Sequence, residues 1–117
     1  MTARLLRVAD ERAVCERCVI AERMLPRMRG LLGRRELPAG EGLLLRPAPS
    51  VHTWFMRFPI DVVFLDRELR VMSVRSHVRP WRMARQRRAR AVLELAAGEA
   101  QRRGVATGDQ LRLVSAG

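Results

Sequence analysis

Short apolar runs alternate with polar and turn-forming residues along the chain, at a spacing typical of short β-strands. This pattern predicts strands at residues 4–8, 14–20, 43–45, 51–55, 60–65, 69–78, 91–96 and 110–114. Charged residues at 66–68 predict a tight hairpin between two of these strands. We also expect the strands on either side of residues 56–59 to pair across that bend, in a sheet centred on residues 52–66.

Two further stretches have helical character. Residues 24–33 place five apolar side chains at helical spacing, with Pro26 in the first turn and Gly33 at the end. Residues 98–103 predict a single helical turn. Many short strands with two short helices favour an α+β, mainly antiparallel β domain, with a small rolled sheet or barrel-like core. A length of 117 residues suits one such domain, so we expect residues 1–117 to form a single unit.

The net charge of +11 suggests an anionic partner, either a small molecule or a polyanion. However, all 23 basic residues are Arg, and the chain contains no Lys, Asn or Tyr. The missing amino acids have A/T-rich codons, so this composition indicates a GC-rich genome in which Arg replaces Lys on solvated surfaces. The charge is therefore a weaker sign of nucleic-acid binding than its size suggests. No apolar run is long enough for a membrane span or a secretory signal, so we expect a cytoplasmic location.

The stretch VHTWFMRFPIDVVFLD at residues 51–66 is distinctive. It resembles the conserved family known as domain of unknown function 192. Further blocks that are similar to this family follow the expected order at residues 29–34, 40–45, 92–98 and 104–111. The resemblance spans residues 13–114. It implies a compact, mainly β domain of bacteria and archaea with no established reaction, and its pattern does not include Cys15 and Cys18.

His52 and Asp61 are the strongest polar candidates for chemistry. They lie nine positions apart on neighbouring predicted strands, where pairing would bring them within side-chain reach. A His held by a carboxylate can serve as a general base, although no nucleophile stands at a telling spacing. The alternatives are that Asp61 caps a turn while His52 packs at the sheet rim, or that both residues bind a ligand.

Aromatic and apolar residues gather between these two candidates. Trp54, Phe55, Met56 and Phe58 form a cluster that core packing alone would explain. If the cluster forms a pocket instead, Trp54 and Met56 lie at its floor, with His52 and Arg57 at its mouth. The candidate ligand-binding residues are therefore His52, Trp54, Met56, Arg57 and Asp61.

The segment from Arg79 to Arg90 contains six Arg and no acidic residue, without a clear strand or helix period. Arg side chains can clamp phosphate, and Trp81 can stack on a base or a sugar. A solvated loop is the alternative. The candidate anion-binding residues are Arg79, Trp81, Arg82, Arg85, Arg87 and Arg88.

Cys15 and Cys18 form a Cys-x-x-Cys motif. Two thiolates supply half of a tetrahedral zinc site, and adding His52 and His77 gives spacings that match no zinc finger or ribbon. Residues 13–20 favour a strand, which would place the two sulfur atoms on opposite faces. We therefore expect two reduced thiols, with metal or redox chemistry as the alternative.

Glu94 is a carboxylate within the apolar residues 92–95. In a strand with one solvated face it would point outward. The alternative is a half-buried carboxylate that pairs with an Arg.

Three functions stay open. The first is a small soluble, non-enzymatic binding module for an anionic ligand or partner. The second is a small hydrolase-type enzyme that uses His52 with Asp61, and the third is nucleic-acid binding through the segment from Arg79 to Arg90. The chain has no phosphate loop, dinucleotide fingerprint, metal-ligand pair or nucleophile elbow, so we favour the first and expect no cofactor and no metal. The oligomeric state is left open.

Overall fold

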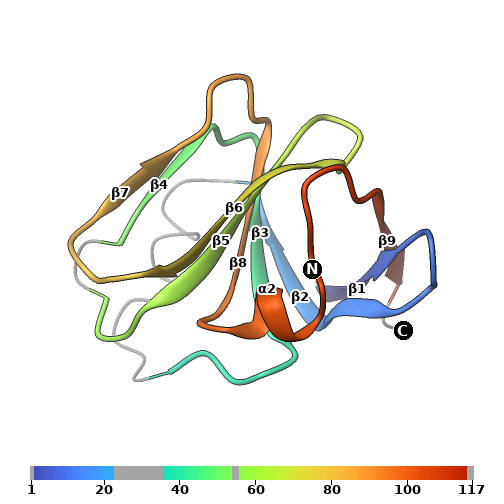
Figure 1. Cartoon of the computed structure of the whole chain (residues 1–117), viewed down its shortest axis with the longest axis horizontal. Coiled ribbons are helices and arrows are strands. Elements are labelled where there is room, and N and C mark those ends of the chain that lie inside the picture. Colours follow the sequence, from blue (N-terminus) through green and yellow to red (C-terminus); the bar gives the residue numbers. More distant parts are fainter. Residues whose placement is uncertain (1, 23–35, 54–55, 116–117) are drawn as a thin grey trace.

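The computed structural model describes residues 2–22, 36–53 and 56–115 of the chain. These residues form nine strands and one short helix (Figure 1). The elements are β1 (Thr2–Arg7), β2 (Ala13–Ala21), β3 (Glu41–Leu45), β4 (Ser50–His52), β5 (Ile60–Leu65), β6 (Val71–Val78), β7 (Met83–Arg85), β8 (Ala91–Ala96), α2 (Glu99–Arg102) and β9 (Leu111–Ser115).

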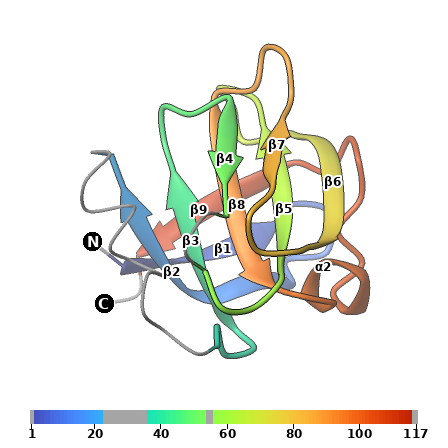
Figure 2. The ribbon, with the colours of Figure 1, turned by 90° about the vertical axis from the view of Figure 1, so that its left-hand side faces the viewer.

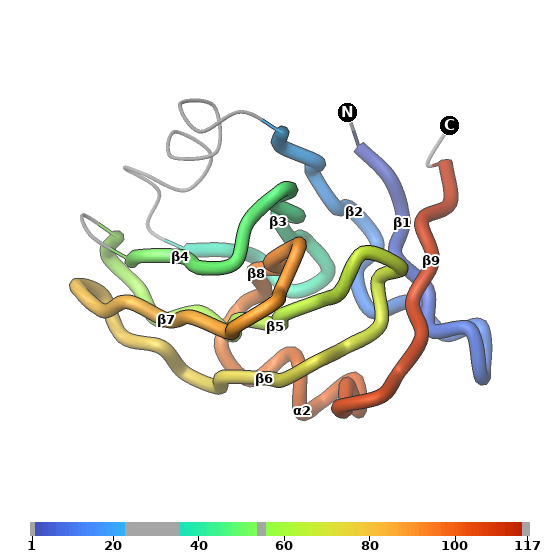
Figure 3. Tube along the Cα trace, turned by 90° about the horizontal axis from the view of Figure 1, so that it is seen from above, coloured from blue at the N-terminus to red at the C-terminus, as the bar shows by residue number. Residues whose placement is uncertain are grey.

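Seven of the strands form one curled sheet in the order β6-β5-β8-β3-β2-β1-β9. Every neighbouring pair is antiparallel except β2 with β3, which is parallel. The two edge strands approach each other at one end, where Arg70 and Gln110 form an isolated bridge (Figure 3). The described strands therefore form a rolled but open sheet.

The sheet separates two apolar layers. Along β5, Val63 and Leu65 belong to the helix-side layer, which also contains Ala100 of α2. Ile60, Val62 and Phe64 alternate with them and belong to the small-sheet layer. The small-sheet layer is covered by the second sheet, in which β4 pairs with β7 (Figure 2). Both faces of β5 are thus buried, which explains its uninterrupted apolar sequence.

The predicted fold class is confirmed: the described chain is an α+β domain, mainly antiparallel β, with one short helix. The strands predicted at residues 60–65 and 91–96 match β5 and β8. The predicted helical turn contains α2. The barrel-like alternative is wrong, because the sheet stays open between β6 and β9. The helix predicted at residues 24–33 lies outside the described residues.

The predicted pairing across residues 56–59 is wrong. β4 pairs with β7 in the small sheet, whereas β5 pairs with β6 and β8 in the large one. The large sheet is therefore not centred on residues 52–66. The error arose because β7 is only three residues long and carries one buried apolar side chain, Ala84, within a run of Arg. Such a short strand shows no alternation of apolar and polar residues, so the sequence did not reveal β7 as the partner of β4.

Candidate functional site

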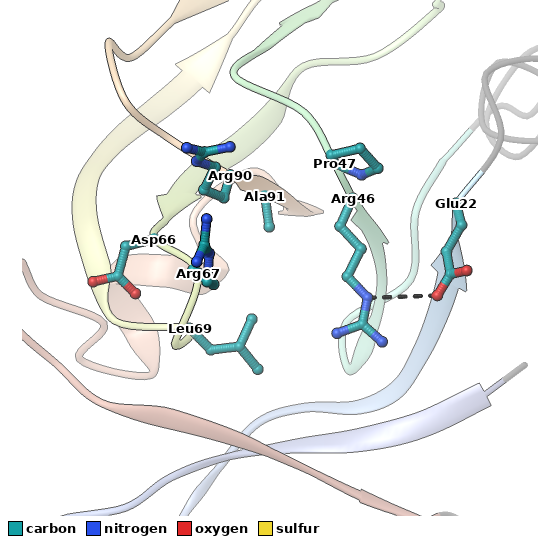
Figure 4. A pocket seen from close by; sticks show the side chains of 8 residues that line it. All are labelled: Glu22, Arg46, Pro47, Asp66, Arg67, Leu69, Arg90 and Ala91. Atoms are coloured by element: carbon teal, nitrogen blue, oxygen red, sulfur yellow. Dashed lines mark ion pairs between the residues drawn. The ribbon is translucent and has the colours of Figure 1, made fainter.

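A pocket of about 400 Å³ opens where β2, β3 and β5 end and β8 begins (Figure 4). The adjacent positions of β5, β8, β3 and β2 in the sheet bring together residues that are far apart in the sequence. The lining residues are Glu22, Arg46, Pro47, Asp66, Arg67, Leu69, Arg90 and Ala91. We call this site the arginine pocket.

Of the described residues, three arginines and two acidic residues line the arginine pocket, but the carboxylates are already engaged. Glu22 forms an ion pair with Arg46, with 3.7 Å between Oε1 and Nε. Asp66 Oδ1 accepts hydrogen bonds from the backbone N–H groups of Glu68 and Arg70, each at 2.9 Å. In Figure 4 the Asp66 carboxylate points away from the space between the arginines.

Arg67 and Arg90 lie on the side of the pocket opposite Arg46 (Figure 4). Within the described ranges, neither side chain forms an ion pair or a hydrogen bond. Both residues are exposed, so their charges stay hydrated when the pocket is empty. The geometry therefore offers two guanidinium groups whose donors are available to an anion.

Leu69 and Ala91 form the apolar part of the pocket wall, together with the ring of Pro47. Leu69 has a φ of 66°, a conformation that is uncommon for a non-glycine residue. It is held there by the hairpin, since its N–H donates to the Asp66 carbonyl at 3.1 Å and its carbonyl accepts from Leu111 N–H at 3.1 Å. The hairpin thus fixes both Arg67 and the apolar wall.

A second pocket of about 490 Å³ shares Pro47 and Arg90 with the first. Arg88 also lines it, so this face carries a fourth guanidinium group. Among the predicted anion-binding residues, only Arg88 reaches either pocket. The sequence-based prediction missed Arg46, Arg67 and Arg90, because nothing in the local sequence shows that their three strand ends are neighbours.

The structure does not bring His52 and Asp61 together as predicted. His52 is on β4 of the small sheet, while Asp61 is on β5, where it shares the helix-side face with Val63. Asp61 is fully buried, and its oxygen atoms accept from three backbone N–H groups: His77 at 2.9 Å, Gly98 at 3.0 Å and Ala100 at 2.9 Å. The carboxylate therefore fixes the start of α2 and the end of β6.

The other predicted ligand-binding residues are dispersed. Trp54 lies outside the described residues. Met56 is buried in the small-sheet layer, and Arg57 is exposed. Neither lines the arginine pocket or its neighbour.

The predicted anion-binding residues fall into two groups. Arg79, Trp81 and Arg82 precede β7, whereas Arg87 and Arg88 follow it. Arg85 is on β7 itself. The segment from Arg79 to Arg90 is therefore a short strand with a basic turn at each end.

Cys15 and Cys18 are both free thiols and both fully buried in the helix-side layer. The prediction of opposite faces is wrong, because the β1–β2 register is irregular: Ala3 pairs with Cys18 and Leu5 with Cys15. A step of three residues along β2 thus matches a step of two along β1. This bulge turns both sulfur atoms to the same face of the sheet. The hydrogen bond with Cys18, together with burial, raises the pKa of Cys15. In the described residues, no group of three metal-binding side chains is found.

The buried thiols give a direct prediction. In the native protein, we expect neither cysteine to react with Ellman's reagent within minutes, because both sulfur atoms are buried in the helix-side layer. In denaturing urea, both should react. Rapid labelling of one thiol under native conditions would contradict this placement.

Glu94 is 3% exposed, so the expectation of an outward-facing side chain is wrong. Its strand neighbours are Leu43 on β3 and Val62 on β5, both in the small-sheet layer. Among residues 2–22, 36–53 and 56–115, no hydrogen bond or ion pair of the carboxyl group is found. The Arg partner of the alternative prediction is therefore not found in these ranges. Burial raises the pKa of Glu94 to about 8.

The described strands thus define an open, mainly antiparallel α+β domain with a basic pocket at one end of its sheet. The chain belongs to the family DUF192, described as an uncharacterized ACR, whose model matches residues 6–113. No curated protein matches the chain. The described residues contain no helix that is both long and apolar enough to cross a membrane.

Two solved structures show the same fold. One is a protein from Sinorhizobium meliloti 1021, described as a candidate transcription regulator, with 24% identity and a TM-score of 0.81 over 96% of this chain and 92% of that one. The other is a protein of unknown function from Novosphingobium aromaticivorans, with 23% identity and a TM-score of 0.80 over 96% and 84%. At these identities, the similarity establishes the fold alone.

Proposed function

We propose that this protein is a non-enzymatic binding module whose arginine pocket holds a small anionic ligand. The observation that supports this most strongly is the pair Arg67 and Arg90 in one pocket, where Glu22 pairs with Arg46 and the Asp66 carboxylate accepts from two backbone N–H groups. A guanidinium group presents its donors in a planar fork that matches phosphate and carboxylate oxygens. The pair is therefore suited to an anionic group with two or more oxygen atoms.

The size and the wall of the arginine pocket limit the ligand further. A volume of about 400 Å³ lies within the range of metabolite sites. Leu69, Ala91 and Pro47 give one side of the pocket an apolar surface. The best match is an anion that also carries a carbon skeleton, such as a phosphorylated or carboxylated metabolite.

The residues that line the pocket favour binding over catalysis. Among the described lining residues there is no His, Ser, Thr or Cys, so they supply no hydroxyl or thiol nucleophile and no imidazole base. The two carboxylates there are held by Arg46 and by backbone N–H groups. The hydrolase alternative depends on His52 with Asp61. It is the weaker candidate, because the Asp61 carboxylate is occupied by three backbone N–H groups and lies on the helix-side face of β5.

The proposal predicts that anion binding depends on Arg67 and Arg90. Isothermal titration calorimetry at low salt with pyrophosphate, citrate and adenosine 5′-monophosphate should detect binding of at least one of them. We expect R67A and R90A each to weaken that binding about tenfold or more, since each removes a charge-assisted contact.

The matched control is R12A, because Arg12 is exposed in the turn between β1 and β2, away from the pocket. Its affinity should stay within about twofold of the wild type, since Arg12 lines neither the arginine pocket nor its neighbour. The proposal fails if none of the three anions binds, or if R67A and R90A bind as tightly as R12A.

A further inference from the structure

The turn between β6 and β7 lies at the left-hand end of the molecule in Figures 1 and 3. Two large apolar side chains are exposed at this tip, Trp81 in the turn and Met83 at the start of β7. Trp81 is 57% exposed and Met83 is 65% exposed, more than any other large apolar residue in the described chain. Trp and Met are enriched at binding surfaces relative to the rest of a protein surface. This tip therefore needs a reason other than core packing.

The exposure of Trp81 is built into the fold, because Thr53 anchors the turn from inside. Thr53 is fully buried, and its hydroxyl group donates to the Arg79 carbonyl at 2.6 Å and accepts from Arg82 N–H at 2.8 Å. Its carbonyl accepts from Trp81 N–H at 3.0 Å, and its N–H donates to the Arg82 carbonyl at 2.8 Å. Four hydrogen bonds to one buried residue thus fix the turn.

The backbone at the tip is also held in an uncommon conformation. Trp81 has a φ of 62°, in the left-handed region that bulky residues rarely adopt. Such a conformation is strained for a bulky residue and persists only where the surroundings enforce it. The Thr53 anchor enforces it here, and the result is an indole ring directed away from the core.

The charges of the segment that carries the tip are all positive. Arg79, Arg82 and Arg85 are exposed, and no acidic residue occurs in this segment. An exposed aromatic residue that is flanked in the chain by exposed arginines can bind a base by stacking and the neighbouring phosphates by charge. Within a duplex, the faces of the bases are covered by their neighbours, so stacking on a side chain requires an unpaired base.

We propose that this tip binds single-stranded nucleic acid. Trp81 stacks on a base, Met83 adds an apolar contact, and Arg79, Arg82 and Arg85 contact the phosphates. This surface is separate from the arginine pocket, which lies at the other end of β6, about 25 Å away for an eight-residue strand. The proposal is therefore independent of the small anion proposed for that pocket.

Fluorescence anisotropy with labelled single strands and duplexes of about 12 nucleotides tests this proposal. We expect the single strand to bind more tightly than the duplex, and W81L to weaken single-strand binding about five- to a hundredfold while the thermal unfolding midpoint stays unchanged. The triple variant R79Q/R82Q/R85Q should also reduce the slope of log affinity against log salt by about 2, the value for three contacts to a single strand.

The triple variant R4Q/R12Q/R17Q is the matched control, since it removes the same charge from exposed residues on and between β1 and β2. It should bind the single strand with nearly the wild-type salt slope. The proposal is overturned if the single strand does not bind at low salt, if W81L binds as well as the wild type, or if the two triple variants lose binding equally. Titration of vesicles with anionic lipids adds a further arm: Trp81-dependent binding to vesicles without binding to the single strand would assign the tip to a membrane surface and contradict the proposal.

Discussion

Replacing Asp61 with alanine is expected to lower the free energy of unfolding by about 3–6 kcal/mol. The carboxylate accepts hydrogen bonds from three backbone N–H groups, those of His77, Gly98 and Ala100. Alanine would leave these donors unsatisfied at a residue that is fully buried, and each unsatisfied group costs about 1–3 kcal/mol. Equilibrium unfolding in urea, followed by circular dichroism, measures this loss.

Two companion variants sharpen the test of Asp61. Asp61→Asn keeps one acceptor oxygen, so we expect it to lose less stability than Asp61→Ala. Asp10→Ala removes an exposed carboxylate that pairs with Arg7, and it should unfold at nearly the wild-type urea concentration. If D61A were as stable as D10A, the structural role assigned to Asp61 would be wrong, and its part in the hydrolase alternative would regain weight.

Glu94 is expected to make the protein less stable as the pH rises. Burial raises the pKa of the folded-state carboxyl group to about 8 from an ordinary value of 4.5, so the folded protein binds a proton that the unfolded chain has released. Below the lower value, both states are protonated and Glu94 has no effect. Between the two values stability falls, and above pH 8 the full penalty of about 5 kcal/mol applies.

The variant Glu94→Gln isolates this effect, because it keeps the shape of the side chain and cannot ionise. Urea unfolding of both proteins from about pH 4 to pH 9 should show the wild type losing stability relative to E94Q as the pH rises through this range. All other titrating groups are shared and cancel in the difference. A difference that does not change with pH would mean that the Glu94 carboxyl group is solvated or paired in the folded protein.

The strands that the sequence predicted best are those with the simplest environment. β5 and β8 are buried on both faces, so their apolar runs begin and end where the strands do. β7 was missed because three residues with one inward side chain carry no period. Because β7 was not predicted, β5 was the nearest strand in the sequence that could pair with β4, and the wrong partner was predicted.

The candidate site was less predictable than the fold. Arg46 follows β3, Arg67 follows β5 and Arg90 precedes β8. The three residues line one pocket only because these strands are neighbours in the sheet. The order of the strands in the sheet cannot be read from the local sequence around each arginine. The environment of Cys15 and Cys18 was hidden for a similar reason, because a bulge between β1 and β2 reverses the face that alternation would assign.

The segment from Arg79 to Arg90 was correctly identified as an exposed basic stretch, but its division into two turns by β7 could not be foreseen. One turn carries Trp81 on the Thr53 anchor, and the other carries Arg88 beside the arginine pocket. Trp81 thus precedes β7, whereas Arg88 and Arg90 follow it. Their variants can be tested separately.

The most direct test of the arginine pocket is to map an anion onto it by nuclear magnetic resonance. In a titration with pyrophosphate, we predict that the largest shifts occur in the amide signals of Arg67, Leu69 and Ala91 and in the side-chain Nε–H signals of Arg46, Arg67 and Arg90. Signals of α2, which lies beside the start of β5 while the pocket opens at its end, should stay in place. Shifts that are absent, or that are confined to Trp81 and its neighbours, would contradict the account.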